Sequence, residues 1–141
     1  MIVWSVISAS ARENKMSQTE ESTIAGEHAV QISMIDLLRR SIKEGKSIDE
    51  KTAILDQLIS YTEVHFMSEQ LIMRQHSYEG YDEHDGEHDI LMEQLLTINN
   101  QVLSNETRLE IKLLRELREL LLTHIATHDK KLANYLASTE N

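Results

Sequence analysis

The sequence contains no cysteine and no proline, and it has only four glycines among its 141 residues. The absence of cysteine excludes disulfides, thiolate metal sites and cysteine nucleophiles. Without proline, and with so little glycine, almost nothing in the chain interrupts a helix. Aromatic residues are scarce, at 4%, whereas Leu, Ile, Met, Glu and Lys are plentiful. This balance favours an all-α protein.

Positively charged residues are also few. The chain has 14 Lys and Arg but 24 Asp and Glu, which gives a net charge of −10. Such a surface repels nucleic acid and anionic membranes, so we expect neither as a partner. No apolar run approaches membrane-spanning length. The initial apolar run Ile2-Val3-Trp4 lacks the basic start and the long apolar stretch of a signal peptide. We therefore expect a cytoplasmic protein.

Apolar residues recur at steps of three and four in four segments, which predicts four amphipathic helices. Gly45 can end the first helix, and Ser47 to Glu50 resembles a capping box that starts the second. Thr107 to Glu110 is a second possible box. The breaks lie near Gly45, over Ser77 to Asp82, and at Ser104-Asn105. The predicted helices cover roughly 19–44, 48–75, 83–103 and 107–136.

Short loops between four helices predict an up-down-up-down antiparallel four-helix bundle. We assign residues 1–17 to an N-terminal arm and residues 18–141 to the bundle domain. No repeat or interdomain linker divides the chain.

Polar residues interrupt the apolar stripes where the core should be. The stripe of the second helix includes His65 and Glu69, and the stripe of the third includes His84 and His88. On the first helix His28 lies between Ile24 and Ile35. On the fourth, the stripe Leu113, Leu117, Leu120 leads to His124.

All of these groups fall toward one end of an up-down bundle. Buried polar groups need partners. One inward histidine is usually a satisfied core residue, but inward histidines from four helices, joined by a glutamate, predict a metal site.

Two candidates for a further ligand follow His124, namely His128 and Asp129. A regular α-helix would place His128 beside His124 and turn Asp129 about 140° away. Continuing the stripe through His128, however, brings Lys131 inward, whereas continuing through Asp129 brings in Leu132 and Leu136. We therefore favour Asp129 over His128 and predict a π-type turn between Leu122 and Lys130.

Together these residues resemble the hemerythrin family, and especially its bacterial members. His65-Phe66-Met67-Ser68-Glu69 is similar to the family's HFxxE, and His124-Ile125 begins its HIxxxD. Tyr78 matches the tyrosine of the loop before the third helix. The likeness covers about residues 23–136. The chain departs from the family's pattern at Ala25, Glu27 and Glu79, where Asp, Gln and Pro are usual, and Trp4 lies far upstream of the family's arm tryptophan.

The resemblance implies two iron ions with an oxo or hydroxo bridge and O2 as ligand. It implies His84, His88 and His124 on one iron and His28 and His65 on the other. Glu69 and Asp129 bridge the pair, and the second iron keeps a position open for oxygen.

Five neutral imidazoles and two carboxylates favour the reduced iron pair and reversible binding, whereas carboxylate-rich bundles suit oxygen activation. Imidazole also suits zinc, copper and nickel, so iron rests on the resemblance.

We expect an oxygen sensor module or an oxygen carrier or store, and not an enzyme. A sensor would act on a fused or separate signalling output domain. The alternatives are a di-iron oxidase or peroxidase and an iron-storage bundle.

The remaining histidines receive simpler interpretations. We expect His76 to be a cap or surface group, and His128 to face solvent or lie behind the ligands. The acidic run from Asp82 to Asp89 is interpreted as a solvated helix start that complements the helix dipole.

Overall fold

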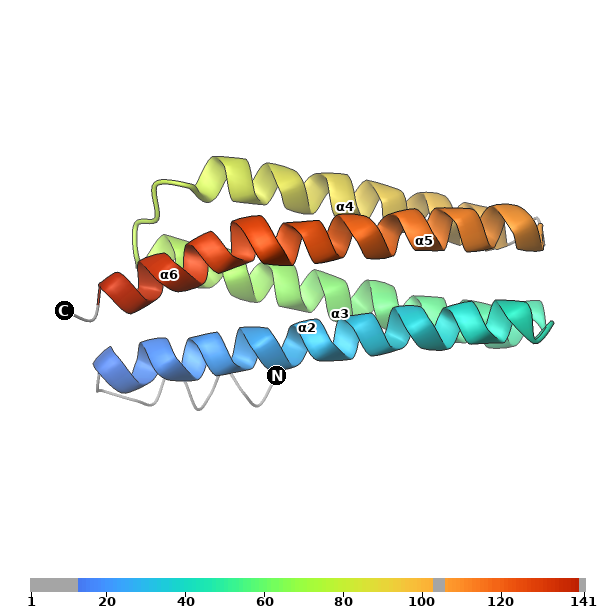
Figure 1. Ribbon diagram of the computed structural model, residues 1–141, viewed down its shortest axis with the longest axis horizontal. Coiled ribbons are helices and arrows are strands. Elements are labelled where there is room, and N and C mark those ends of the chain that lie inside the picture. Colours follow the sequence, from blue (N-terminus) through green and yellow to red (C-terminus); the bar gives the residue numbers. More distant parts are fainter. Residues whose placement is uncertain (1–12, 103–105, 140–141) are drawn as a thin grey trace.

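The computed structural model describes residues 13–102 and 106–139, and the side chains of this part from residue 26 onward. Five α-helices and one π-helical turn follow one another along it: α2 (Glu13–Lys43), α3 (Ile48–Gln75), α4 (Tyr81–Val102), α5 (Thr107–His124), η1 (Ile125–Asp129) and α6 (Lys130–Ser138). In Figure 1, α5 and α6 continue one another as a single rod beside the other three.

The four rods form an antiparallel bundle. Helix α2 packs on α3, α3 on α4, α4 on α5, and α5 back on α2, so that the ring of contacts closes around one interior. This confirms the predicted fold class. Residues 1–12 of the predicted N-terminal arm lie outside the described residues, and α2 begins at Glu13, so the division between arm and bundle stays a prediction. None of the described helices is long and apolar enough to cross a membrane.

The first two loops begin with the same hydrogen-bond pattern at a helix end. Gly45 has a φ of 69°, its N–H donates to Ile42 O, and the Lys46 N–H donates to Ser41 O. This is a Schellman motif, and it requires the left-handed conformation that glycine adopts without steric cost. Ser77, with a φ of 49°, takes the same role after α3. The chain then reverses within a few residues.

One predicted cap forms and the other does not. The Ser47 hydroxyl accepts a hydrogen bond from the Glu50 N–H at 3.1 Å, as the capping box predicts. The second box is wrong, because Glu106 takes the N-cap position of α5 and makes no side-chain cap bond. The Glu110 carboxylate is fully buried and instead binds Lys51 Nζ on α3, at 3.1 and 3.2 Å.

The core runs the length of the bundle along the predicted stripes, with Leu38, Leu55 and Ile98 fully buried. The stripe predicted for the fourth helix is out of phase, because Leu113 is only half-buried and Leu120 is exposed. Leu114, Leu117 and Leu121 are buried instead and lead to His124 at the same three- and four-residue steps. In a helix with leucine at so many positions, both phases fit the period.

A second, smaller apolar cluster closes the end of the bundle at which α3 ends and α6 lies. It contains Ile72, Met73, Tyr78, Leu132 and Leu136. The Tyr135 hydroxyl donates a hydrogen bond to His76 O at 2.8 Å, which ties α6 to the end of α3. His76 is the C-cap of α3, as the sequence predicted.

We predict that Lys51→Met destabilises the protein by about 3–5 kcal/mol, because the Glu110 carboxylate would stay buried without its cation. Urea unfolding, followed by circular dichroism, measures this. The double variant Lys51→Met, Glu110→Leu should recover most of the loss. A single variant as stable as the parent would contradict a structural role for the ion pair.

Candidate metal centre

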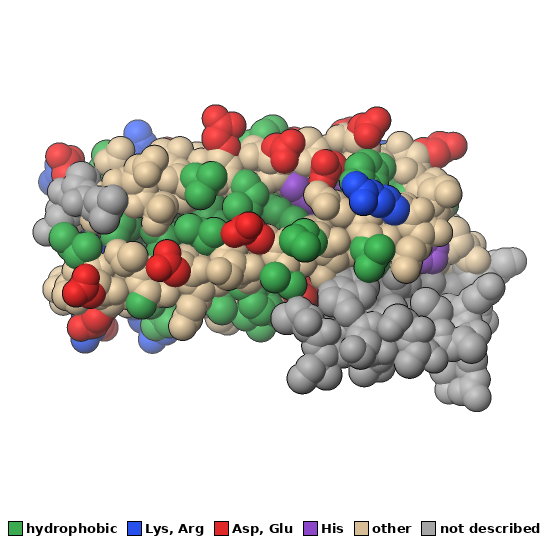
Figure 2. All heavy atoms as spheres, turned by 180° about the vertical axis from the view of Figure 1, so that it is seen from behind, with side chains coloured by type: hydrophobic (Ala, Val, Ile, Leu, Met, Phe, Trp, Pro, Cys, Tyr) green, Lys and Arg blue, Asp and Glu red, His purple; other side chains and the backbone are tan. Residues whose placement is uncertain are grey.

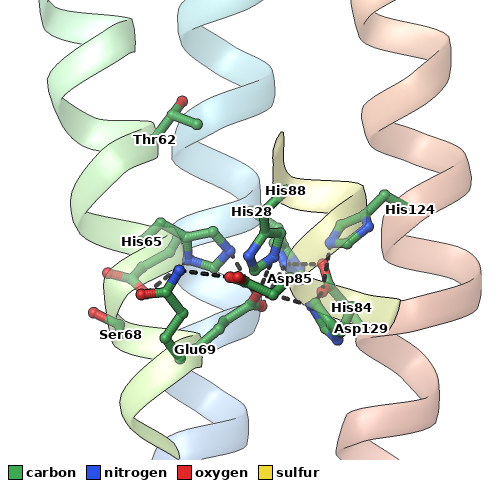
Figure 3. Close-up of polar contacts among 12 residues, drawn as sticks. His28, Thr62, His65, Ser68, Glu69, His84, Asp85, His88, His124 and Asp129 are labelled. Atoms are coloured by element: carbon green, nitrogen blue, oxygen red, sulfur yellow. Dashed lines mark hydrogen bonds and ion pairs between the residues drawn. The ribbon is translucent and has the colours of Figure 1, made fainter. Parts of the chain in front are cut away.

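All seven residues predicted as ligands converge inside one end of the bundle (Figure 3). Helix α2 brings His28, α3 brings His65 and Glu69, and α4 brings His84 and His88. His124 is the last residue of α5, and Asp129 is the last residue of η1. Every one of them except the half-buried His28 is buried.

The side chains form two groups that share both carboxylates. Glu69, His84, His88, His124 and Asp129 make one group, and His28 and His65 with the same Glu69 and Asp129 make the other. In each group the potential ligand atoms all lie within 4.8 Å of one another.

Each carboxylate directs one oxygen to each group. Glu69 Oε1 lies 2.8 Å from His88 Nε2 and 3.1 Å from His84 Nε2, whereas Oε2 lies 3.3 Å from His65 Nε2 and 3.8 Å from His28 Nε2.

Asp129 is divided in the same way. Its Oδ1 lies 3.0 Å from both His84 Nε2 and His124 Nε2, and its Oδ2 lies 2.7 Å from His28 Nε2. Each of the two carboxylates could therefore contact an ion in either group.

The donor set fits a pair of metal ions. Of the twelve buried side-chain nitrogen and oxygen atoms without a hydrogen-bond partner among the described residues, seven are Nε2 atoms or carboxylate oxygens of these residues that take part in the contacts above. Leaving so many polar atoms buried and unsatisfied would be costly. Donors held about 2.1 Å from one ion, at right angles, lie about 3 Å apart. The contacts between carboxylate oxygens and imidazole nitrogens are 2.7 to 3.3 Å long, except for 3.8 Å between Glu69 and His28.

The turn that carries Asp129 has the predicted form. Residues Ile125–Asp129 are π-helical, between the regular helices α5 and α6. Asp129 is buried, Lys131 is exposed, and Leu132 and Leu136 are fully buried, as the register argument required.

His128 stays outside both groups. It is half-buried, and its Nε2 lies 3.6 Å from Glu87 Oε1.

A carboxylate that the sequence did not single out as functional orients one of the histidines. Glu27 Oε1 lies 2.9 Å from His65 Nδ1, and both side chains are buried. Such a contact fixes the orientation of the imidazole ring and makes its other nitrogen a better metal ligand. The sequence carried a signal for an inward Glu27, because this residue directly precedes His28 and lies one turn before Gln31. The structure shows that Gln31 is buried as well. Glu27 was identified only as a departure from the family's usual glutamine.

Aromatic and apolar groups shield the cluster. The ring of Phe66 stacks on His88, with centroids 3.8 Å apart and planes within 6°. Phe66 also belongs to the main apolar core on one side of the cluster, and the group around Ile72 and Leu132 covers the other side. Interactions between the charged groups are therefore little weakened by water.

The carboxylates and imidazoles shift one another's pKa values. Burial lowers the pKa of His65, but the charge of Glu69 and neighbouring hydrogen bonds outweigh burial and raise it to about 10. Burial also opposes protonation of His84, yet hydrogen bonds to Asp129 and Glu69 raise its pKa to about 9. For His88 burial prevails and lowers the pKa. Burial alone would raise the pKa of Glu69, but the surrounding imidazoles hold it well below its usual range.

Comparison with known proteins agrees with this arrangement. The model of the family described as the hemerythrin HHE cation binding domain matches residues 19–136. The chain therefore belongs to the hemerythrin family, whose domain is described as binding cations. Searches of curated proteins and of solved structures gave no match.

We predict that His124→Ala lowers the metal content and the thermal unfolding midpoint together, because binding free energy also stabilises the fold. His128→Ala is the matched control, since it removes a neighbouring imidazole outside both groups, and it should leave both quantities unchanged. Metal analysis and calorimetry measure them. Full metal content in the His124 variant would remove it from the ligand set.

The pKa shifts predict an opposite pH dependence with and without metal. In protein stripped by a chelator, the raised pKa values of His65 and His84 contribute stability that is complete below pH 6.5 and lost as the pH rises through about 9 to 10. The lowered pKa of Glu69 contributes stability that is lost as the pH falls below 4.5. The stripped protein should therefore be most stable between pH 4.5 and pH 6.5.

Metal must displace the same protons, so its binding should release protons and strengthen as the pH rises. Denaturant unfolding at several pH values, and proton release on metal addition, measure the two effects. A stripped protein more stable at pH 9.5 than at pH 6 would contradict the charge assignment.

Proposed function

We propose that this chain reversibly binds dioxygen at a non-haem di-iron centre, as an oxygen sensor module or as an oxygen carrier or store. The single observation that carries the proposal is the division of the Glu69 and Asp129 oxygens between a group of three imidazoles and a group of two. An iron pair bound there would supply the electrons that dioxygen takes up on binding and returns on release.

The unequal division of histidines supports a position for an external ligand. Three imidazoles and two carboxylate oxygens would offer one ion five protein donors, whereas His28 and His65 with the other two oxygens would offer a second ion four. The second ion would therefore have more positions open to a small molecule. It is also on the side where Glu27 holds His65 in place.

The surroundings support binding of a small molecule rather than chemistry on an organic substrate. The cavity that adjoins the cluster at Phe66 has a volume of about 10 Å³, and it is lined mainly by leucines, with Gln31 and Thr62 as its polar residues. A space of this size holds about one water molecule. We therefore infer a binding protein and not an enzyme.

The residues have separable roles in this function. Glu69 and Asp129 would hold the two ions together, and the five imidazoles would complete the ligand set without adding negative charge. Phe66 and the apolar cluster around Leu132 exclude water. Five neutral donors with two anions would favour the reduced form of the pair, to which the centre would return when dioxygen is released unchanged. A sensor and a carrier share these features and differ in whether an output domain responds.

We predict that the iron-loaded, reduced protein gains a visible absorption band under oxygen and loses it under argon, through repeated cycles, with one dioxygen bound per iron pair. Asp129→Asn should abolish the cycle, since it removes one bridging charge. Asp85→Asn is the matched control, because Asp85 binds Gln70 on the same end of the bundle but lies outside both groups.

Continuous oxygen consumption with a reductant would favour an oxidase instead. A metal content far from two ions per chain would favour storage. Either result would overturn the proposal.

A further inference from the structure

A hollow on the surface between α2 and α5 collects positive charge. It lies on the half of the bundle away from the metal cluster, with a volume of about 470 Å³ and a floor of Ile35 and Leu114. Its rim carries the cationic residues Arg39, Arg40, Lys43, Arg115 and Arg118. We call it the basic groove.

The charge of the basic groove is opposite in sign to the net charge of the molecule. It holds five of the 14 cationic residues of the chain, but only Asp36 and Glu119 of the 24 acidic ones. The local balance is therefore positive on a protein whose net charge is −10. Figure 2 shows another face of the bundle, where acidic side chains are scattered over the surface and basic ones are few.

Most of these cations have no acidic partner. Arg118 Nε lies 3.1 Å from Asp36 Oδ1 across the groove. No ion pair joins Arg39, Arg40, Lys43 or Arg115 to an acidic side chain of the described residues. Four like charges from two helices thus face the same hollow, and their repulsion is relieved when an anion lies between them.

The position of the residues on their helices does not account for the cluster. Arg40 and Lys43 lie in the last turn of α2, where cations complement the helix dipole. Arg115 and Arg118, however, lie well inside α5, where that reason does not apply. Their approach to the α2 cations follows from the packing of the two helices.

We propose that the basic groove binds a small molecule that carries phosphate groups. The planar guanidinium groups of arginine bind phosphate oxygens in pairs, and arginine supplies four of the five cations. A hollow of this volume is within the usual range for small-molecule sites, about 300–1,000 Å³. The proposal is independent of oxygen binding.

Calorimetric titration of the full metal-loaded chain with pyrophosphate at low salt tests the proposal, with inorganic phosphate and ATP as further arms. We expect pyrophosphate to bind more tightly than phosphate, and a further gain with ATP if the ligand is a nucleotide. The double variant Arg39→Gln, Arg115→Gln should bind pyrophosphate about tenfold or more weakly, because it loses charge-assisted hydrogen bonds.

The matched control is Lys130→Gln, Lys131→Gln, which removes the same charge from exposed positions of α6 and should leave the affinity unchanged. Circular dichroism of each variant verifies the fold, and metal content after titration shows whether the phosphates extract metal. Equal losses in both double variants, or no binding of pyrophosphate, would overturn the proposal. Preference for an acidic peptide over every phosphate arm would also overturn it, in favour of a protein partner.

Discussion

The structure depends on two carboxylates held among five imidazoles in the interior of a helical bundle. Neither Glu69 nor Asp129 could be buried alone, because an unpaired charge in an apolar interior costs several kcal/mol or more. Each is surrounded by imidazole nitrogens from at least two other helices. The same contacts that make burial tolerable bring every rod of the bundle to one point.

The cluster therefore acts on the fold as well as on the chemistry. It is placed between the main apolar core and the smaller cluster around Leu132, so water has little access to it. Glu27 extends the polar network outward by one residue, since its carboxylate holds the far side of His65. At the other end of the bundle, Lys51 and Glu110 form a second buried pair, which fixes the relative position of α3 and α5.

Most of the fold and the composition of the site could be predicted from the sequence. Both follow from the spacing of apolar residues, histidines and carboxylates along single helices. The π-type turn followed from a conflict of registers, in which His124 and Leu132 could both face inward only if one residue was surplus. Side-chain pairs that join two helices outside the predicted ligands were not predicted. Glu110 resembled part of a capping box, and its partner Lys51 is 59 residues away.

The phase of the α5 stripe was missed for a different reason. Leucines at 113, 114, 117, 120 and 121 satisfy the helical period in two ways, and only packing against α2 and α4 decides between them. The basic groove was equally invisible, because no spacing within α2 or α5 reveals which cations will meet.

The π-helical turn has a mechanical consequence. One added residue in a regular helix would rotate everything after it by about 100°. The turn over Ile125–Asp129 takes up that rotation, so that α6 keeps Leu132 and Leu136 against its neighbours while Asp129 faces the cluster. The orientation of α6 about its axis is thus coupled to the position of the Asp129 carboxylate at its N-terminus. A small displacement of Asp129 would therefore rotate α6 about its own axis. That rotation would also move the side chains at the far end of this helix, at the surface.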